Sequence, residues 1–155
     1  MRHRIPLLKL LLFVSLSFNS AVFANQTHSL PLLVSASRTF YIEATIGDLN
    51  SSKFMLDTGS GYTTINQASF ESLQKQHKIH FVKKVTGVLA DGSQRSVEIW
   101  EVESLTLNGE CTLKNIQVAF MPGTQRQILG LTTLAKAAPF TVSIDPPSLT
   151  VSNCV

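Results

Sequence analysis

The chain lacks most of the short motifs that mark metal sites and common hydrolases. Its 155 residues contain no Cys-x-x-Cys pair, no clustered histidines, no Gly-x-Ser-x-Gly and no His-Glu-x-x-His. The first two absences argue against a metal site, and the last two against an elbow-type serine hydrolase and a zinc protease. We therefore expect neither a metal nor a cofactor, and any hydrolytic chemistry has to come from other side chains.

Acidic residues are absent from the start of the chain, where residues 1–24 also differ in composition from the rest. This segment begins with basic residues, is nearly apolar over 7–18 and ends in small residues up to Ala24. The pattern is typical of a secretory signal peptide cleaved after Ala24. An uncleaved membrane anchor is the alternative, but the apolar run is short for a bilayer span. We expect a periplasmic or secreted protein without a stable membrane span after cleavage.

The excess of basic residues disappears with the signal peptide. The whole chain has 13 Lys and Arg residues against 10 Asp and Glu residues. Arg2, Arg4 and Lys9 precede the cleavage site, whereas the first acidic residue is Glu43, so the remaining chain is formally neutral. A neutral chain offers no electrostatic basis for binding nucleic acid, and we expect no such partner.

Only two cysteines are present, Cys111 and Cys154. In an exported chain an even number of cysteines favours a disulfide, which would join these two residues. Two buried free thiols are the alternative.

The most informative stretch runs from Phe54 to Gly61 and reads F-M-L-D-T-G-S-G. Its apolar start predicts a buried strand, and the abrupt change at Asp57 predicts a tight loop with the carboxylate at its tip. Gly59 and Gly61 permit backbone angles and close approaches that other residues resist. The β-branched residues after the loop predict a return to sheet. For the tripeptide alone, an ordinary turn without a catalytic role is the simpler interpretation.

Strand-like segments and turn signals alternate along the rest of the chain. Segments rich in β-branched and aromatic residues lie at 39–46, 53–57, 79–90, 96–107, 111–120, 140–145 and 149–152. Asp91-Gly92 and Asn108-Gly109 predict hairpin turns, Asn66 predicts the start of a short helix, and residues 131–138 are expected to form one or two further helical turns. The pattern predicts a single mostly-β domain over 38–155, preceded by an N-terminal leader or arm at 25–37.

Four features of the chain occur in the order found in one protein family. They are F-M-L-D-T-G-S at 54–60, a hairpin with Ala90-Asp91-Gly92 at its tip, Ile128-Leu129-Gly130 and a final hairpin. The chain resembles the retropepsin-like aspartic proteases, of the bacterial single-lobe kind related to retroviral proteases and to one half of pepsin. The resemblance runs from about Leu30 to Val151. It implies a closed, single-lobe β-barrel that hydrolyses peptide bonds in peptides or unfolded proteins.

The resemblance also assigns roles to individual residues. Asp57 is the implied catalytic aspartate. The implied support of its loop comes from Thr58, Gly59, Ser60, Leu129 and Gly130, with the Thr58 hydroxyl bracing a dimer and Ser60 supporting the carboxylate. The implied flap over the substrate has its tip at Ala90, Asp91, Gly92 and Ser93. Single-lobe relatives usually have Ala in place of Ser60 and often Asn in place of Asp91.

Peptide hydrolysis by carboxyl groups requires two of them, one acting as base and one as acid. The chain has four aspartates, and only Asp57 follows an apolar strand in D-T-G; Asp48, Asp91 and Asp145 lie in turn-like sequence. The second carboxyl group is therefore expected from another copy. This predicts a homodimer with the two copies of Asp57 facing each other at the two-fold axis.

Strands at the chain ends form much of the dimer interface in the retroviral relatives. By analogy, Leu30–Val34 and Leu149–Val151 are the expected interface strands, because apolar segments at a chain end are more easily explained by a partner than by the chain's own core. Two alternatives to a protease remain. One is a non-catalytic retropepsin-like module of the cell envelope that binds peptides or a partner protein, and the other is a structural β-domain with a chance D-T-G.

Overall fold

The structure is a computed structural model that describes residues 26–154. The expected signal peptide lies outside these residues. In chain order the elements are β1 (His28–Pro31), β2 (Leu33–Val34), β3 (Phe40–Ile46), β4 (Ser52–Leu56), β5 (Thr63–Thr64), α1 (Gln67–Lys75), β6 (Ile79–Val88), β7 (Gln94–Leu107), β8 (Cys111–Phe120), β9 (Ile128–Leu129), α2 (Leu131–Lys136), β10 (Phe140–Ile144) and β11 (Pro147–Val151).

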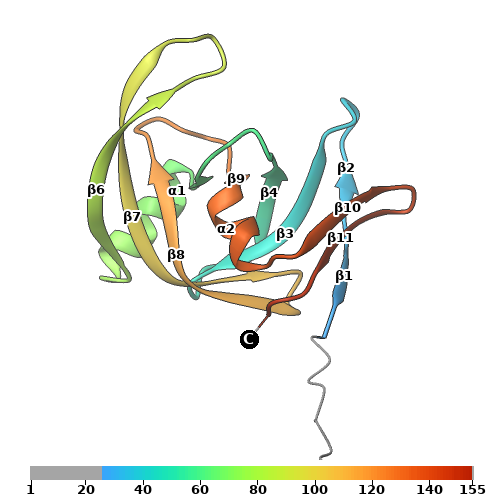
Figure 1. The fold of residues 1–155 in the computed structure, drawn as a ribbon. Coiled ribbons are helices and arrows are strands. Elements are labelled where there is room, and N and C mark those ends of the chain that lie inside the picture. Colours follow the sequence, from blue (N-terminus) through green and yellow to red (C-terminus); the bar gives the residue numbers. More distant parts are fainter. Residues whose placement is uncertain (1–25, 155) are drawn as a thin grey trace, which may run out of the picture.

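Six strands close into a barrel at the centre of the molecule (Figure 1). Neighbouring strands follow the order β3-β4-β9-β5-β8-β7, and β7 pairs back with β3, with Ala44 opposite Leu107 and Ile46 opposite Leu105. β2 and β6 extend the sheet beyond the closed part at its two ends. The predicted mostly-β closed barrel is confirmed, and α1 and α2 lie where the two short helical segments are predicted.

Alternating side chains fill the inside of the barrel. Along β3, Ile42, Ala44 and Ile46 are at most 1% exposed, whereas the residues between them face outward. Burial of one large apolar side chain contributes about 1.5–3 kcal/mol to folding. A slip by one residue would turn this buried set outward, so the burial fixes the register of β3 against its neighbours.

Helix α1 begins where the sequence predicts. The Asn66 side chain accepts a hydrogen bond from the backbone N–H of Ser69 at 2.8 Å and so caps the first turn. The buried face of the helix carries Phe70 and Leu73. Phe70 stacks on Phe120 of β8, with ring centroids 3.7 Å apart, and attaches the helix to the barrel. Among residues 26–154, no helix is long and apolar enough to cross a membrane.

The segment expected to be a leader or arm contributes strands to the fold. β1 pairs with β11, and β11 pairs with β10, so the N-terminal strand shares a three-stranded sheet with the C-terminal hairpin (Figure 1). β2 pairs with β3 at the edge of the larger sheet. The folded unit therefore includes residues that lie before the expected domain start at residue 38.

The same three-stranded sheet corrects the argument for the interface strands. Leu30, Leu149 and Val151 are fully buried within one chain, because β1 and β11 pack against the same core as the barrel. These side chains need no second copy to cover them. The exposed apolar side chains in this region are Leu33 at 44%, Val34 at 50% and, at the end of β10, Ile144 at 77%.

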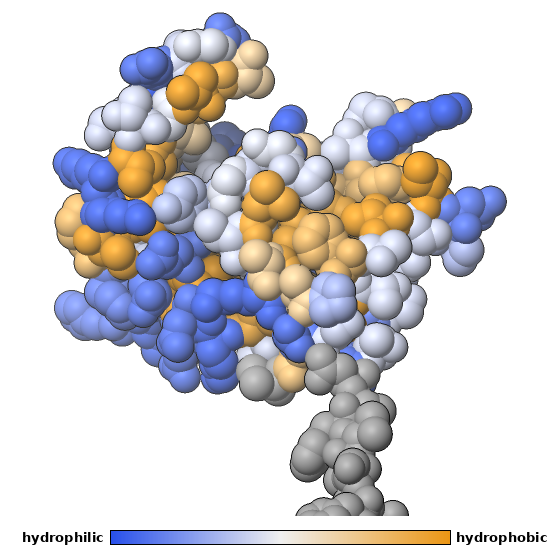
Figure 2. All heavy atoms as spheres, in the orientation of Figure 1, coloured by the Kyte–Doolittle hydropathy of each residue, from blue (hydrophilic) through white to orange (hydrophobic). Residues whose placement is uncertain are grey.

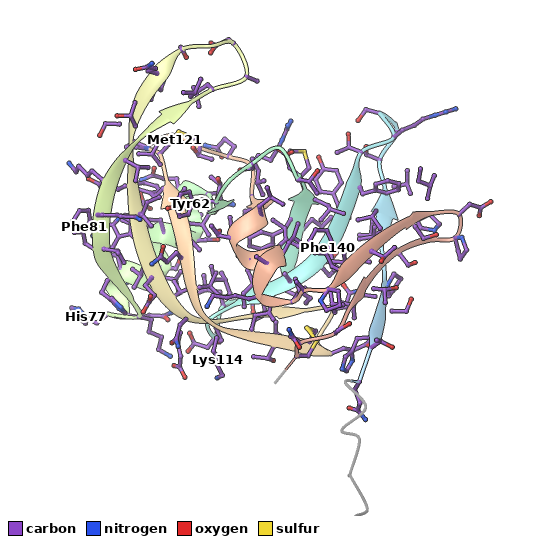
Figure 3. All side chains as sticks on the ribbon, in the orientation of Figure 1. Tyr62, His77, Phe81, Lys114, Met121 and Phe140 are labelled. Carbon is purple, nitrogen blue, oxygen red and sulfur yellow. A yellow bond between two sulfur atoms is a disulfide. The ribbon has the colours of Figure 1, made fainter. Side chains whose placement is uncertain are left out.

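A disulfide joins Cys111 to Cys154, with the Cα atoms 4.9 Å apart. Cys111 is the first residue of β8, and Cys154 lies beyond the end of β11. The bond therefore ties the end of the chain to the barrel (Figure 3). Because 43 residues separate the two cysteines in the sequence, the loop-closure model gives a stabilisation of about 4 kcal/mol.

Candidate active site

The loop that carries Asp57 connects β4 to β5. β4 ends at Leu56, and Asp57 is the first residue of the loop. The Asp57 carboxylate accepts a hydrogen bond from the N–H of Gly59 at 2.9 Å, and the Asp57 carbonyl accepts one from the N–H of Ser60 at 3.2 Å. Asp57 is partly exposed. The turn is therefore closed locally, with the carboxylate accessible from outside the barrel.

A second segment, 127–131, holds this loop at both of its ends. At the start of the loop, the N–H of Asp57 donates to the carbonyl of Leu129 at 3.2 Å. At the end of the loop, the N–H of Leu131 donates to the carbonyl of Ser60 at 2.8 Å. Because these bonds come from a distant part of the sequence, the position of the carboxylate depends on the tertiary fold and not on the turn alone.

Gly130 is required by the close approach of the two segments. A Cβ atom at this position would lie 2.3 Å from the carbonyl oxygen of Tyr62 and 2.9 Å from that of Ser60. Both oxygens belong to the backbone, so they could give way only if the loop moved. Leu129 and Gly130 thus lie directly against the Asp57 loop, the place that the sequence analysis gave them.

Two buried threonines near the loop were not identified from the sequence. Thr63 of β5 and Thr133 of α2 are at most 1% exposed, and their hydroxyl oxygens lie 2.6 Å apart. The Thr63 oxygen also accepts a hydrogen bond from the N–H of Gly130 at 3.1 Å. The pair therefore satisfies buried polar groups where β5, β9 and α2 meet. A Thr-Thr pair after the loop is a weak sequence signal, and only the fold brings Thr133 to it.

The Ser60 hydroxyl makes a different bond from the one expected. It donates to the carbonyl of Tyr62 at 2.8 Å, whereas the Asp57 carboxylate is bound by the N–H of Gly59. The Ser60 side chain reaches the carbonyl two residues ahead because the loop turns there, and it supports the backbone of the loop instead of the acid. Thr58 is exposed, and its expected role across a dimer interface stays a prediction.

Strands β6 and β7 form a long hairpin that projects from the barrel (Figures 1 and 2). The N–H of Leu89 donates to the carbonyl of Ser93 at 2.8 Å, and the N–H of Gly92 donates to the carbonyl of Leu89 at 2.9 Å. Gly92 has a φ of 78°, the left-handed conformation that its place in the turn requires. Ala90, Asp91, Gly92 and Ser93 therefore form the tip of the hairpin, as predicted.

The acid at the hairpin tip is held by local bonds. Asp91 accepts a hydrogen bond from the N–H of Ser93 at 2.9 Å. Hydrogen bonding by Ser93, through its side chain and its N–H, lowers the pKa of the Asp91 carboxyl. The side chain is fully exposed. Asp91 is thus a solvated negative charge and is unsuited to act as the protonated partner of Asp57.

A groove of about 330 Å³ lies between the hairpin and the Asp57 loop. The loop contributes Gly59, Ser60 and Gly61 to its wall, and β6 with the start of the turn contributes residues 85–89. Tyr62 and Met121, which lie near the base of the hairpin in Figure 3, line it as well. In a single chain the tip residues 90–93 do not line the groove. The strand before them does, and its edge could bind an extended peptide.

The groove contains no acidic lining residue. Asp48 lies elsewhere, on the turn after β3, and binds Lys78. The hydrogen bond from the Lys78 side chain lowers the pKa of the Asp48 carboxyl. Within residues 26–154, no group of three or more His, Cys, Asp or Glu side chains is placed to hold a metal ion. Asp57 does not line the groove itself, but its loop does, through Gly59, Ser60 and Gly61.

Comparisons with known proteins agree with this architecture. The family described as gag-polyprotein putative aspartyl protease matches residues 42–136. A crystal structure of a retropepsin-like aspartic protease from Rickettsia conorii is similar, with a TM-score of 0.61 and 17% identity, over 84% of this chain and 95% of that chain. At this identity the likeness shows the fold. The search of curated proteins finds no match.

The family match covers more than half of the chain and includes all three parts of the site. Residues 42–136 contain the Asp57 loop, the β6–β7 hairpin and the segment around Gly130. The chain therefore belongs to the gag-polyprotein aspartyl protease family and has a retropepsin-like fold.

Proposed function

We propose that the protein is an aspartic endopeptidase whose catalytic dyad consists of Asp57 from each of two identical chains. One observation carries the proposal. Asp57 stands on a loop that distant backbone bonds hold at both ends, beside a groove roofed by the β6–β7 hairpin. A loop without a catalytic role would not need its acid to be both accessible and fixed in this way.

The chemistry needs two carboxyl groups that share one proton. The ionised group takes a proton from a water molecule, whose oxygen then attacks the carbonyl carbon of the peptide bond. The protonated group donates its proton to the developing oxyanion, which gives a tetrahedral diol. The first carboxyl group then passes the proton that it took from water to the amide nitrogen, and one diol hydroxyl returns a proton to the second carboxylate as the C–N bond breaks. The products are a carboxylic acid and an amine, and each carboxyl group ends ready for another cycle.

A second copy supplies what one chain lacks. The described residues offer a single suitable acid, and retropepsin-like proteins typically act as dimers. Within residues 26–154, β10 pairs with β11 on one side only, so its other edge is free. Two β10 edges related by a two-fold axis can pair in antiparallel fashion. This edge replaces the buried side chains of β1 and β11 as the proposed interface.

Apolar side chains beside this edge support the same assembly. Leu131 at the start of α2 is 41% exposed and Ile144 on β10 is 77% exposed, with Phe140 and Val142 partly exposed between them. Figure 2 shows apolar residues gathered over α2 and β10 on one face. An exposed apolar face next to a free strand edge is typical of an interface.

The proposed substrate is a peptide or an unfolded protein, bound in extended form in the groove.

We place the protein in the periplasm or outside the cell, with support from the signal-like residues 1–24 and from the disulfide between Cys111 and Cys154. Alkylation of exported protein without reductant tests whether the disulfide forms there. Two alkylated thiols in such material would contradict the disulfide and remove its support for this compartment.

Turnover of an unfolded protein by the purified chain tests the proposal. Wild-type protein should cleave it, a statine-type inhibitor should block the cleavage, and Asp57→Asn should remove it. Mixing equal amounts of wild-type and Asp57→Asn chains under subunit exchange should lower the activity per wild-type chain to about half, because mixed dimers lack one carboxylate. Activity that stays proportional to the wild-type chain alone would show that a monomer performs the reaction.

Binding without turnover would favour the alternative, a peptide- or partner-binding module of the cell envelope. The groove by itself could serve such a module, since an extended segment can pair with β6 without any chemistry. A peptide that binds wild-type and Asp57→Asn chains equally, and that neither chain cleaves, would establish that alternative over the protease.

A further inference from the structure

The outer face of β4 and β9 carries a cation beside the catalytic carboxylate. These strands are parallel neighbours, with Met55 opposite Ile128. Alternate residues of a strand point to the same side, so Asp57 shares the face of Met55, and the bond from its N–H to Leu129 shows that the strand geometry continues that far. The exposure of these residues agrees with this assignment of faces, because Phe54 and Leu129 are fully buried whereas Met55 and Ile128 are partly exposed.

Arg126 belongs to the same face. It lies two residues before Ile128, and the next residue, Gln127, is buried at 4% exposure. One guanidinium nitrogen of Arg126 lies 3.8 Å from the sulfur of Met55. The side chain of Arg126 therefore runs along β4 to a residue that is two positions before Asp57.

Within the part of the chain that the structure describes, the guanidinium group of Arg126 has no anionic partner. Among residues 26–154, no carboxylate lies within 4.0 Å of it, and its one recorded polar contact is the Met55 sulfur. A thioether is a weak acceptor, so most of the five N–H donors stay available. Three lysines of the described residues are paired with carboxylates, as Lys84 is with Glu98 at 3.1 Å.

We propose that Arg126 is a specificity-determining residue that binds a carboxylate of the substrate close to the scissile bond. The inference rests on the proposed function, because it concerns the substrate that Asp57 would act on. Arginine presents a planar fork that matches a carboxylate in two parallel hydrogen bonds. The sulfur of Met55, two residues before Asp57, contacts one guanidinium nitrogen of Arg126. An acidic residue in the substrate is the side chain that fits this cation.

Matched peptides provide the test. Peptides of one cleavable sequence, each with Glu or with Gln at a single position near the scissile bond, are compared by kcat/KM. Wild-type protein should prefer Glu over Gln at one position by roughly three- to tenfold at low salt, as expected for an exposed but bidentate ion pair. Arg126→Gln should reduce this ratio to about one, and Arg126→Lys should keep part of it because the charge remains.

A control variant separates the local contact from net charge. Lys75 is exposed at the end of α1, so Lys75→Gln removes the same charge on a different element. The Glu preference should survive in this variant. Peptides with free and amidated C-termini show whether the bound carboxylate is a side chain or a chain end. An equal preference in Arg126→Gln and wild-type protein would overturn the inference.

Binding to inactive protein separates this inference from the proposed function. In Asp57→Asn chains the dissociation constants of the Glu and Gln peptides are measured by fluorescence anisotropy, with and without Arg126→Gln. A Glu preference that depends on Arg126 supports the inference even if no peptide is cleaved, in which case the proposed function fails alone. Equal dissociation constants in all four combinations, with cleavage intact in wild-type protein, would overturn the inference alone.

Discussion

Two turns in this molecule use the same local chemistry. In the Asp57 loop the carboxylate accepts a hydrogen bond from the N–H of Gly59 at 2.9 Å, and at the hairpin tip the Asp91 carboxylate accepts one from the N–H of Ser93 at 2.9 Å. In both, an aspartate closes a turn by binding the backbone two residues ahead. Neither bond by itself distinguishes a catalytic acid from a solvated one.

The difference between the two turns lies in their distant contacts. Segment 127–131 bonds to both ends of the Asp57 loop, and Gly130 touches its backbone. The backbone bonds that close the tip around Asp91 come from Leu89, Gly92 and Ser93, all within the turn itself. A turn held by its own residues opens at low free-energy cost, whereas one tied to the barrel opens only with part of the fold. The fold therefore makes one aspartate a positioned acid and leaves the other on a movable hairpin.

The largest expected effect separates the two acids. Asp57→Asn should lower turnover by about 10³-fold or more, because it removes the general base without changing side-chain shape. Asp91→Asn should change turnover by about twofold or less, because a solvated side chain at the tip takes no part in proton transfer. Steady-state kinetics on an unfolded protein substrate measures both. The assignment of Asp57 is wrong if its variant keeps more than a few per cent of wild-type turnover at an unchanged melting temperature.

Glycine substitutions test the distant contacts of each turn. Gly130→Ala places a methyl group against the backbone of Tyr62 and should destabilise the fold by about 3 kcal/mol, the upper range for an overpacked core. Gly92 also has a special conformation, but its added Cβ would meet nothing within 4 Å. Gly92→Ala should therefore cost about 1 kcal/mol, from its positive φ alone. Urea unfolding measures the free energy of unfolding of both variants. Equal losses of stability would show that the two turns are equally anchored.

Local sequence predicted the parts of this site that local chemistry forms. The apolar strand before Asp57 and the left-handed turn at Gly92 follow from neighbouring residues, and the structure contains both. The disulfide pairing followed from there being two cysteines. The order of the motifs, together with the family resemblance, placed Leu129 and Gly130 against the loop. The strand and the turn need no knowledge of distant strand pairing, whereas the position of Leu129 and Gly130 came from the family resemblance.

The parts that the sequence did not predict depend on pairing between distant segments. The first strands looked like a leader because a short polar and then apolar segment carries no signal for its partner. Leu30 is buried only because β1 pairs with β11 at the other end of the chain. The contact between Thr63 and Thr133 has the same origin. The Ser60 hydroxyl donates to the carbonyl two residues ahead and not to the carboxylate of Asp57, because the loop geometry brings that carbonyl within reach.

The buried threonine pair offers a smaller test of the distant contacts. Thr63→Val keeps the shape of the side chain but leaves the N–H of Gly130 without its acceptor, which should cost about 1–3 kcal/mol. Thr63→Val should also lower turnover if this contact helps to hold the Asp57 loop. Thr63→Ser keeps the oxygen and should retain most of the stability and turnover, with a small loss of stability from the cavity that the missing methyl group leaves. Urea unfolding and kcat are measured on both. A Val variant as active and stable as wild type would show that the backbone bonds alone hold the Asp57 loop.

The smallest expected effect concerns protonation of the hairpin tip. The pKa of the Asp91 carboxyl lies below its ordinary value of 3.8 because Ser93 hydrogen-bonds to it. A lowered pKa means that the bond is fully present above pH 3.8 and is lost as the pH falls through the lower folded value. Amide exchange and the chemical shift of the Ser93 N–H should therefore titrate with a midpoint below 3.8.

The Gly59 N–H is the internal comparison, since segment 127–131 holds its loop whatever the state of the local bond. Below the midpoint, exchange should rise more at Ser93 than at Gly59, and Asp91→Asn should abolish the titration at Ser93. Exchange at Ser93 that does not change over this pH range would mean that contacts outside the turn hold the hairpin tip, and the contrast between the two turns would fail.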